Sequence, residues 1–129
     1  MKDHVFAKFK LFFYYFLVMK EDKLYENCQT NFWIFLIQIH AGKDVKRFVK
    51  NFYSDYEEML KEYKLEVKNL DIVYGEYDVF LSLSYDPDYL LNKFGKNMIK
   101  ISGDVYDKIR KHKDVALVDM LYPIYGCIK

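Results

Sequence analysis

Few residues in this sequence have the types and spacing that chemistry requires. The histidines are His4, His40 and His112, and no two of them stand at the spacing of a zinc or haem site. The sequence contains no phosphate-binding glycine loop, no G-x-S-x-G turn and no H-E-x-x-H helix. Carboxylates are frequent over residues 55–62, but they alternate with apolar positions, as on the solvated face of a helix. We therefore expect no metal ion or other cofactor, and an enzyme is the less favoured class.

Length and charge narrow the classes further. The chain has 129 residues, which suits one domain. Its 20 Lys and Arg stand against 19 Asp and Glu, and the two signs are interspersed along the chain. Neither membrane binding nor direct nucleic-acid binding is therefore expected. A local basic cluster is interpreted as a solvated helix end; it consists of Lys108, Arg110, Lys111 and Lys113.

An apolar run near the start of the chain, Leu11–Met19, has the hydrophobicity of a signal peptide. It is shorter than the roughly 20 residues of a membrane helix, and charged residues follow it in place of a small-residue cleavage site. We interpret the run as structural and expect a cytoplasmic protein.

Hydrophobic patterning predicts the elements of the first half of the chain. Aromatic and β-branched residues predict a buried strand over residues 31–40. Apolar residues at steps of three and four predict one helix over 45–63, capped by Asp44. Alternating apolar residues then predict a hairpin of two strands, 65–74 and 77–85, with Gly75 at the turn.

The second half is predicted to contain one long helix and one strand. Asp86 and Pro87 are typical of a helix start, and the apolar stripe continues to about Lys111. Two glycines fall inside this helix, and either could mark a kink or a close helix contact; they are Gly95 and Gly103. Residues 115–122 then predict the last strand.

This order of elements, β-α-β-β-α-β, predicts an α+β fold of the ferredoxin-like type, with two helices on one face of a four-stranded antiparallel sheet. The strands carry apolar residues on both faces, and 19% of all residues are aromatic, so the second face should also be covered. A second copy of the sheet would cover it most economically, which predicts a homodimer or a higher homo-oligomer. Residues 1–30 are an N-terminal extension, strand or helix, that could cover part of this face instead; residues 31–129 form the ferredoxin-like domain.

The hairpin turn carries a short motif, Gly75-Glu76-Tyr77-Asp78. The motif, followed by alternating Leu81 and Leu83 and then a helix, resembles the ligand-binding domain of Lrp/AsnC-type regulators, whose hairpin turn has a G-x-Y/F-D signature. The likeness spans about residues 31–122 in outline. Two features depart from the family: Lys113-Asp114 replaces the usual Pro-Gly, and residues 1–30 are too few and too aromatic for a helix-turn-helix.

The resemblance implies a stand-alone sensor domain that forms a dimeric α/β barrel. It also implies an amino-acid-like effector near the hairpin turns and a protein partner that carries a DNA-binding domain. The ligand-binding residues would be Tyr74, Gly75, Glu76, Tyr77 and Asp78, because the turn amides could receive a carboxylate and Asp78 an ammonium group. The alternative is that Gly75 only makes the turn and Asp78 hydrogen-bonds it.

The two cysteines are Cys28 and Cys127, and neither lies in a C-x-x-C motif. In a ferredoxin-like sheet the first and last strands are neighbours, so the two thiols would lie close together. A disulfide closing so long a loop would add about 4–5 kcal/mol in the chain-entropy model. Because cytosolic disulfides are rare, two free thiols are the default expectation and the disulfide is the alternative.

Three classes of function stay open at this point. The first is a small-effector sensing and oligomerisation module that modulates transcriptional regulation. The second is a small dimeric α/β-barrel enzyme, of the monooxygenase or isomerase type, with a polar site between sheet and helices that includes His40 or Tyr74. The third is a purely structural interaction protein whose aromatic surface builds an oligomer.

Overall fold

A computed structural model describes residues 31–122 of the chain. Four predictions lie outside the described residues: the extension 1–30, the apolar run 11–19, and the two cysteines, Cys28 and Cys127. The described elements follow in this order: β1 (Phe32–Ile39), α2 (Val45–Lys50), α3 (Phe52–Asp55), α4 (Glu57–Glu62), β2 (Glu66–Ile72), β3 (Val79–Ser84), α5 (Pro87–Phe94), α6 (Met98–Arg110) and β4 (Val115–Leu121).

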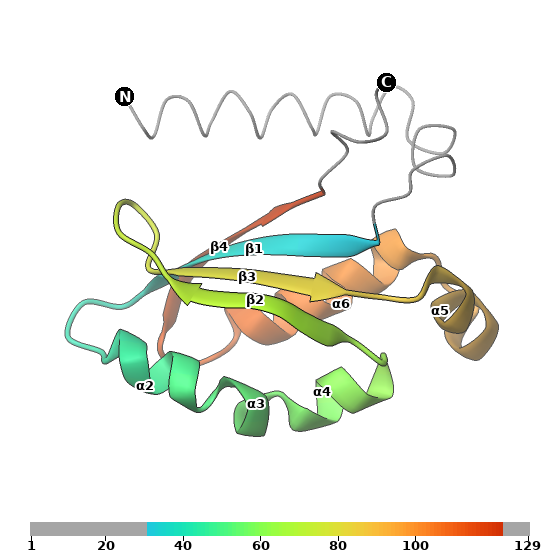
Figure 1. Cartoon of the computed structure of the whole chain (residues 1–129), viewed down its shortest axis with the longest axis horizontal. Coiled ribbons are helices and arrows are strands. Elements are labelled where there is room, and N and C mark those ends of the chain that lie inside the picture. The colour runs from blue at the N-terminus through green and yellow to red at the C-terminus, as the bar shows by residue number, and fades with distance from the viewer. Residues whose placement is uncertain (1–30, 123–129) are drawn as a thin grey trace.

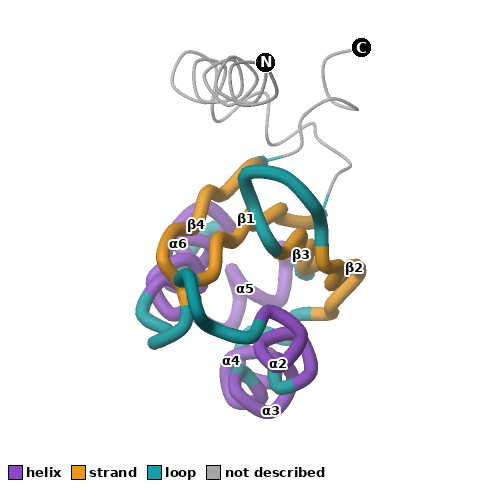
Figure 2. Tube along the Cα trace, turned by 90° about the vertical axis from the view of Figure 1, so that its left-hand side faces the viewer, coloured by secondary structure: helices purple, strands orange, loops and turns teal. Residues whose placement is uncertain are grey.

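The four strands form one antiparallel sheet in the order β2-β3-β1-β4. The helices α2 to α6 all cover the same face of this sheet, as the side view and the end view both show (Figures 1 and 2). The predicted α+β class is therefore confirmed. Sheet and helices are held together by one apolar core, in which alternate residues of β1 and β3 point toward the helices.

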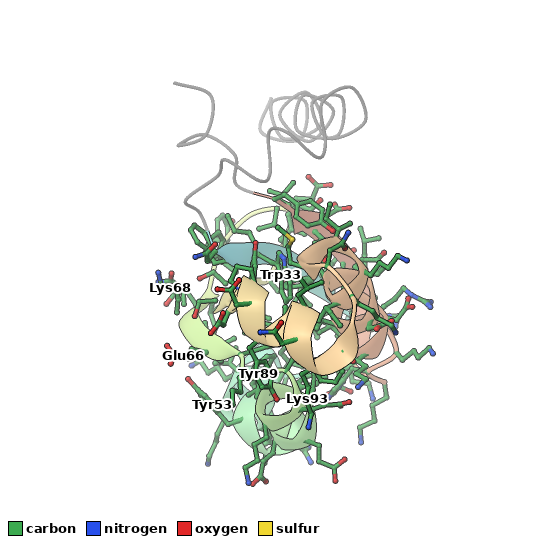
Figure 3. The ribbon with its side chains drawn as sticks, turned by 90° about the vertical axis from the view of Figure 1, so that its right-hand side faces the viewer. Trp33, Tyr53, Glu66, Lys68, Tyr89 and Lys93 are labelled. Carbon is green, nitrogen blue, oxygen red and sulfur yellow. The ribbon has the colours of Figure 1, made fainter. Side chains whose placement is uncertain are left out.

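Trp33 on β1 illustrates how this core is filled. Its indole is fully buried and stacks on Tyr85 with 4.4 Å between ring centroids. Figure 3 shows it between β1 and α5, on the helix side of the sheet. Among residues 31–122 the indole nitrogen has no hydrogen-bond partner, so packing and stacking hold the ring in place.

The prediction of a single helix over residues 45–63 is wrong, because the segment forms three short helices. The interruptions fall at Asn51 and Tyr56, whose backbone angles leave the helical range. Beside the first interruption, the Ser54 hydroxyl donates to the Asn51 carbonyl at 3.0 Å, a side-chain bond that competes with helical geometry. The apolar stripe nevertheless stays on one side, and its buried members are Phe48, Phe52, Tyr56, Met59 and Tyr63.

The second expected helix is also divided. Gly95 adopts a left-handed conformation with φ of 65° and ends α5, and Asn97 then caps α6 by accepting from the Lys100 N–H at 3.0 Å. The predicted start at Asp86 and Pro87, which is the start of α5, is confirmed, since the Asp86 carboxylate accepts from the N–H groups of Asp88 and Tyr89. Gly103 makes no close contact: a Cβ placed there would meet nothing within 4 Å.

The second sheet face, opposite the helices, carries a smaller apolar cluster. Leu36 and Leu121 are its buried centre, and partly buried side chains surround them: Ile34, Tyr77, Phe80 and Tyr122. At the margin of this face Leu117 is 44% exposed. Apolar residues therefore occupy both faces of the sheet, as the sequence predicts.

No helix within residues 31–122 is long and apolar enough to cross a membrane.

Candidate functional site

Three loops meet at the end of the sheet where β1 finishes: the β1–α2 loop, the β2–β3 loop and the α6–β4 turn (Figure 1). Backbone hydrogen bonds hold them there. The His40 N–H donates to the Asp114 carbonyl at 2.9 Å and joins the β1–α2 loop to the α6–β4 turn, and the Asp78 N–H donates to the Ile37 carbonyl of β1 at 2.9 Å. This end of the molecule contains both the motif found in the sequence and an open cleft.

Asp78 in the β2–β3 loop is built into the sheet. Its Oδ2 accepts a hydrogen bond from the Ile39 N–H at 2.7 Å, next to the bulge between Gln38 and Ile39 where β1 changes register against β4. The carboxylate thus extends the β1–β3 pairing one step past the last backbone pair, Ile37 with Val79. This geometry matches the structural alternative for Asp78.

The remaining motif residues follow the same loop over the second sheet face. Gly75 has φ of 141°, a conformation that favours glycine, and the Glu76 carbonyl accepts from Gln38 Nε2 at 3.3 Å. The Tyr77 hydroxyl donates to the Asp119 carboxylate on β4, while Tyr74 is 96% exposed. The loop rises on the side of the sheet opposite the helices (Figure 2). The assignment of Tyr74–Asp78 to an effector site stays a prediction.

The cleft lies on the helix side of the same end. It has a volume of about 720 Å³ and is open to solvent. Its walls come from the β1–α2 loop, from α2 and α3, and from the α6–β4 turn; the lining residues are Gly42, Lys43, Asp44, Arg47, Phe48, Asn51, Asp55, His112, Lys113 and Asp114. Ligand pockets commonly have volumes of roughly 300–1,000 Å³, so the cleft could hold a small molecule.

His112 is held in one tautomer in the cleft wall. Its Nδ1 accepts a hydrogen bond from the Asp114 N–H at 3.1 Å, so the ring proton lies on Nε2, which donates to Asp55 Oδ2 at 3.1 Å. The ring packs edge-on against Phe48 with 5.0 Å between centroids. Both nitrogens are thus engaged, which leaves the neutral ring no lone pair for a general base or a metal ligand.

Tyr56 lies behind His112, with 6.0 Å between ring centroids. Its hydroxyl is buried and has no hydrogen-bond partner in the part of the chain that the structure describes. Burial, and secondarily the negative charge of Asp55, raise the pKa of the Tyr56 hydroxyl far above its ordinary value. The phenol therefore stays neutral over the physiological range.

The cleft carries three exposed cations. Lys43, Arg47 and Lys113 are exposed, and within residues 31–122 none of their side chains forms an ion pair or hydrogen bond. Other exposed lysines, among them Lys46 and Lys50 on α2, also form no ion pair within the described residues. What sets Lys43, Arg47 and Lys113 apart is that all three line one cavity, where they are available to a ligand.

Sequence reasoning did not assign these residues to a site, although a signal existed. Loop 41–44 follows β1 and turn 111–114 precedes β4, and the two strands are antiparallel neighbours. Side chains at the end of one strand and the start of the next must then lie side by side. Lys43 and Lys113 are near such positions, whereas Asp55 was interpreted only as part of the solvated face of a helix.

The residues named for an enzyme site are not brought together. His40 and Tyr74 are both exposed, and neither lines the cleft. Over residues 31–122, no group of three or more His, Cys, Asp or Glu side chains is placed to hold a metal ion.

Comparison with known proteins identifies no relative. No protein-family model matches this chain, and no curated protein matches it either.

Proposed function

We propose that this chain is a small-effector sensing and oligomerisation module whose effector site is the cleft. The single observation that carries the proposal is that a small-molecule-sized cavity is lined by three cations and a carboxylate whose side chains have no partner within residues 31–122. The strand order β2-β3-β1-β4, with all helices on one face, supports a ferredoxin-like arrangement for the fold.

The cleft chemistry suits an amino-acid-like effector. The guanidinium of Arg47 offers two parallel N–H donors to a carboxylate, and Lys43 and Lys113 add charge on either side. Asp114 lies on the same wall and can accept from an ammonium group. Backbone hydrogen bonds hold the β1–α2 loop and the α6–β4 turn in place, so the backbone that carries Lys43, Lys113 and Asp114 is fixed before the effector arrives.

The second sheet face supports the assembly part of the proposal. Leu36 and Leu121 are already buried there, but Leu117 is exposed and the surrounding apolar side chains are only partly buried, so a matching sheet from a second copy would cover them and close an α/β barrel. Such a homodimer, or a larger homo-oligomer, would act on a partner that carries a DNA-binding domain, and so modulate transcriptional regulation in the cytoplasm.

A thermal-shift screen against the amino acids tests the effector site. A ligand at a hundred times its dissociation constant stabilises the native state by about 2.7 kcal/mol, which raises the melting temperature by several degrees. We expect one class of amino acid to do so, and Arg47→Gln to abolish the shift. Lys46→Gln is the matched control, because Lys46 is also exposed on α2 but does not line the cleft. A shift that survives in Arg47→Gln would remove the cleft from the proposal.

A further inference from the structure

We infer that the cleft selects acidic ligands that carry two carboxylates, with glutamate and aspartate as the amino-acid members of the class. The inference rests on the proposed function for its amino-acid part. The preference for two carboxylates stands on the geometry of the cleft alone.

The formal charges of the cleft lining do not distinguish ligand classes. Lys43, Arg47 and Lys113 supply three positive charges, and the lining carboxylates, which are Asp44, Asp55 and Asp114, supply three negative charges. A neutral zwitterion would match that total. The distinction comes from the hydrogen bonds that the carboxylates already make.

Two of the three carboxylates serve the fold. Asp44 Oδ1 accepts from the Arg47 N–H at 3.2 Å and caps α2. Asp55 Oδ2 accepts from His112 Nε2 at 3.1 Å, and the Asp114 N–H holds that ring in the required tautomer. Donors from the protein therefore already orient both carboxylates and stabilise part of their negative charge.

The remaining groups carry a positive surplus. Asp114 is the lining carboxylate whose oxygens accept no hydrogen bond within residues 31–122, while three cations lack partners over the same residues. One ammonium group would satisfy Asp114. One carboxylate on the ligand would leave at least one of Lys43, Arg47 and Lys113 unpaired, whereas two carboxylates would engage all three through a bidentate arginine contact and two lysine contacts.

The walls of the cleft also suit a short dicarboxylate. The lining includes apolar surface, since the buried Phe48 ring packs edge-on against His112 and both residues line the cleft, next to which a short methylene chain could lie. The cations come from two separate segments, the β1–α2 region and the α6–β4 turn. A ligand with a carboxylate at each end could contact cations of both segments.

Isothermal titration calorimetry of the full chain with glutamate and glutamine tests the inference, because the two ligands differ by one charged group. We expect glutamate to bind at least about tenfold more tightly, since a charge-assisted contact is worth roughly that factor or more. We expect Lys113→Gln and Arg47→Gln each to reduce that ratio to within about threefold, and Lys50→Gln, on α2 outside the cleft, to leave it unchanged. Glutarate and inorganic phosphate complete the ligand set.

Each outcome separates the inference from the proposed function. Glutamine binding as tightly as glutamate would overturn the acidic preference and leave the effector role in place. Binding of glutarate without any amino acid would support the dicarboxylate preference and contradict the amino-acid role. Phosphate that binds as tightly as glutamate and competes with it would overturn the carboxylate class. Binding by none of the four would overturn the inference, and the thermal-shift screen against the other amino acids would then decide the effector role.

Discussion

The β2–β3 loop and the cleft lie at the same end of the sheet but use their polar groups in opposite ways. In the loop, Asp78 is hydrogen-bonded to the β1 backbone and Tyr77 to Asp119, so the distinctive residues hold the sheet together. In the cleft, Arg47 and Lys113 have no partner within residues 31–122. The motif therefore contributes at least two residues, Tyr77 and Asp78, to the cohesion of the sheet, while the cleft is inconspicuous in the sequence and chemically available.

The difference shows that a motif of polar residues is no guide to a binding site until its hydrogen bonds are known. A carboxylate that already accepts a backbone N–H gains little from a ligand, because the ligand must first replace that bond. An exposed cation without a partner loses only water. Substitutions in the loop should therefore affect stability, and substitutions in the cleft should affect binding.

The largest expected effect is that of Asp78→Ala on stability. The Ile39 N–H would lose its charged acceptor beside the bulge, and the free energy of unfolding should fall by about 2 kcal/mol, measured by urea denaturation. Asp71→Ala, at an exposed position of β2, should change it by less than about 0.5 kcal/mol. An equal effect of the two variants would contradict the structural role of Asp78.

High pH should destabilise the fold through its tyrosines. Burial raises the pKa of Tyr56, Tyr63 and Tyr122 above that of the unfolded chain, which is about 10. The unfolded state then ionises first, so stability is complete below about pH 10 and falls as the pH rises toward the folded-state pKa. Urea titrations at pH 9 and pH 11 should show the loss.

Tyr56→Phe should make that alkaline loss smaller, by about 1 kcal/mol at pH 11, since one ionisable group is removed. An unchanged pH dependence in this variant would show that Tyr56 is not one of the groups responsible.

At neutral pH, two tyrosine variants should change stability in opposite directions. The Tyr56 hydroxyl is buried without a partner among residues 31–122, so Tyr56→Phe should raise the free energy of unfolding by about 1 kcal/mol. Tyr122→Phe should lower it by about the same amount, because the Tyr122 hydroxyl lies 2.5 Å from Ser102 Oγ. Destabilisation by Tyr56→Phe would mean that its hydroxyl has a partner after all.

The smallest expected effect on stability is that of Arg47→Gln. The side chain is exposed and unpaired within the described residues, so the free energy of unfolding, measured by urea denaturation, should change by less than about 0.5 kcal/mol. The same variant should lose its response to the effector. A large loss of stability would show that Arg47 serves the fold and would weaken the contrast between loop and cleft.

Local patterns in the sequence predicted the elements well where one force dominated. Alternation located the hairpin, and Asp86-Pro87 located the start of α5 to the residue. Periodicity overestimated helix length at Asn51 and Tyr56, because the apolar stripe continues on one side of all three short helices. Gly95 was recognised as a candidate kink, but only its left-handed φ shows that it ends a helix.

The cleft could not be predicted from local patterns, because it depends on residues far apart in the chain. Asp55 and His112 form a hydrogen bond 57 residues apart, and periodicity alone placed Asp55 on a solvated helix face. The pairing of β1 with β4 is what brings Lys43 and Lys113 to the same end of the sheet. The cleft could have been predicted only by asking which loops the expected strand order brings together.

Mapping of backbone amide chemical shifts during a glutamate titration tests the central claim most directly. The account predicts perturbations concentrated in residues 42–55 and 112–114, with saturation at one affinity, and little change in residues 73–78. Perturbations centred on Tyr74–Asp78, with those around Arg47 and Lys113 unmoved, would contradict it and return the effector site to the hairpin turn.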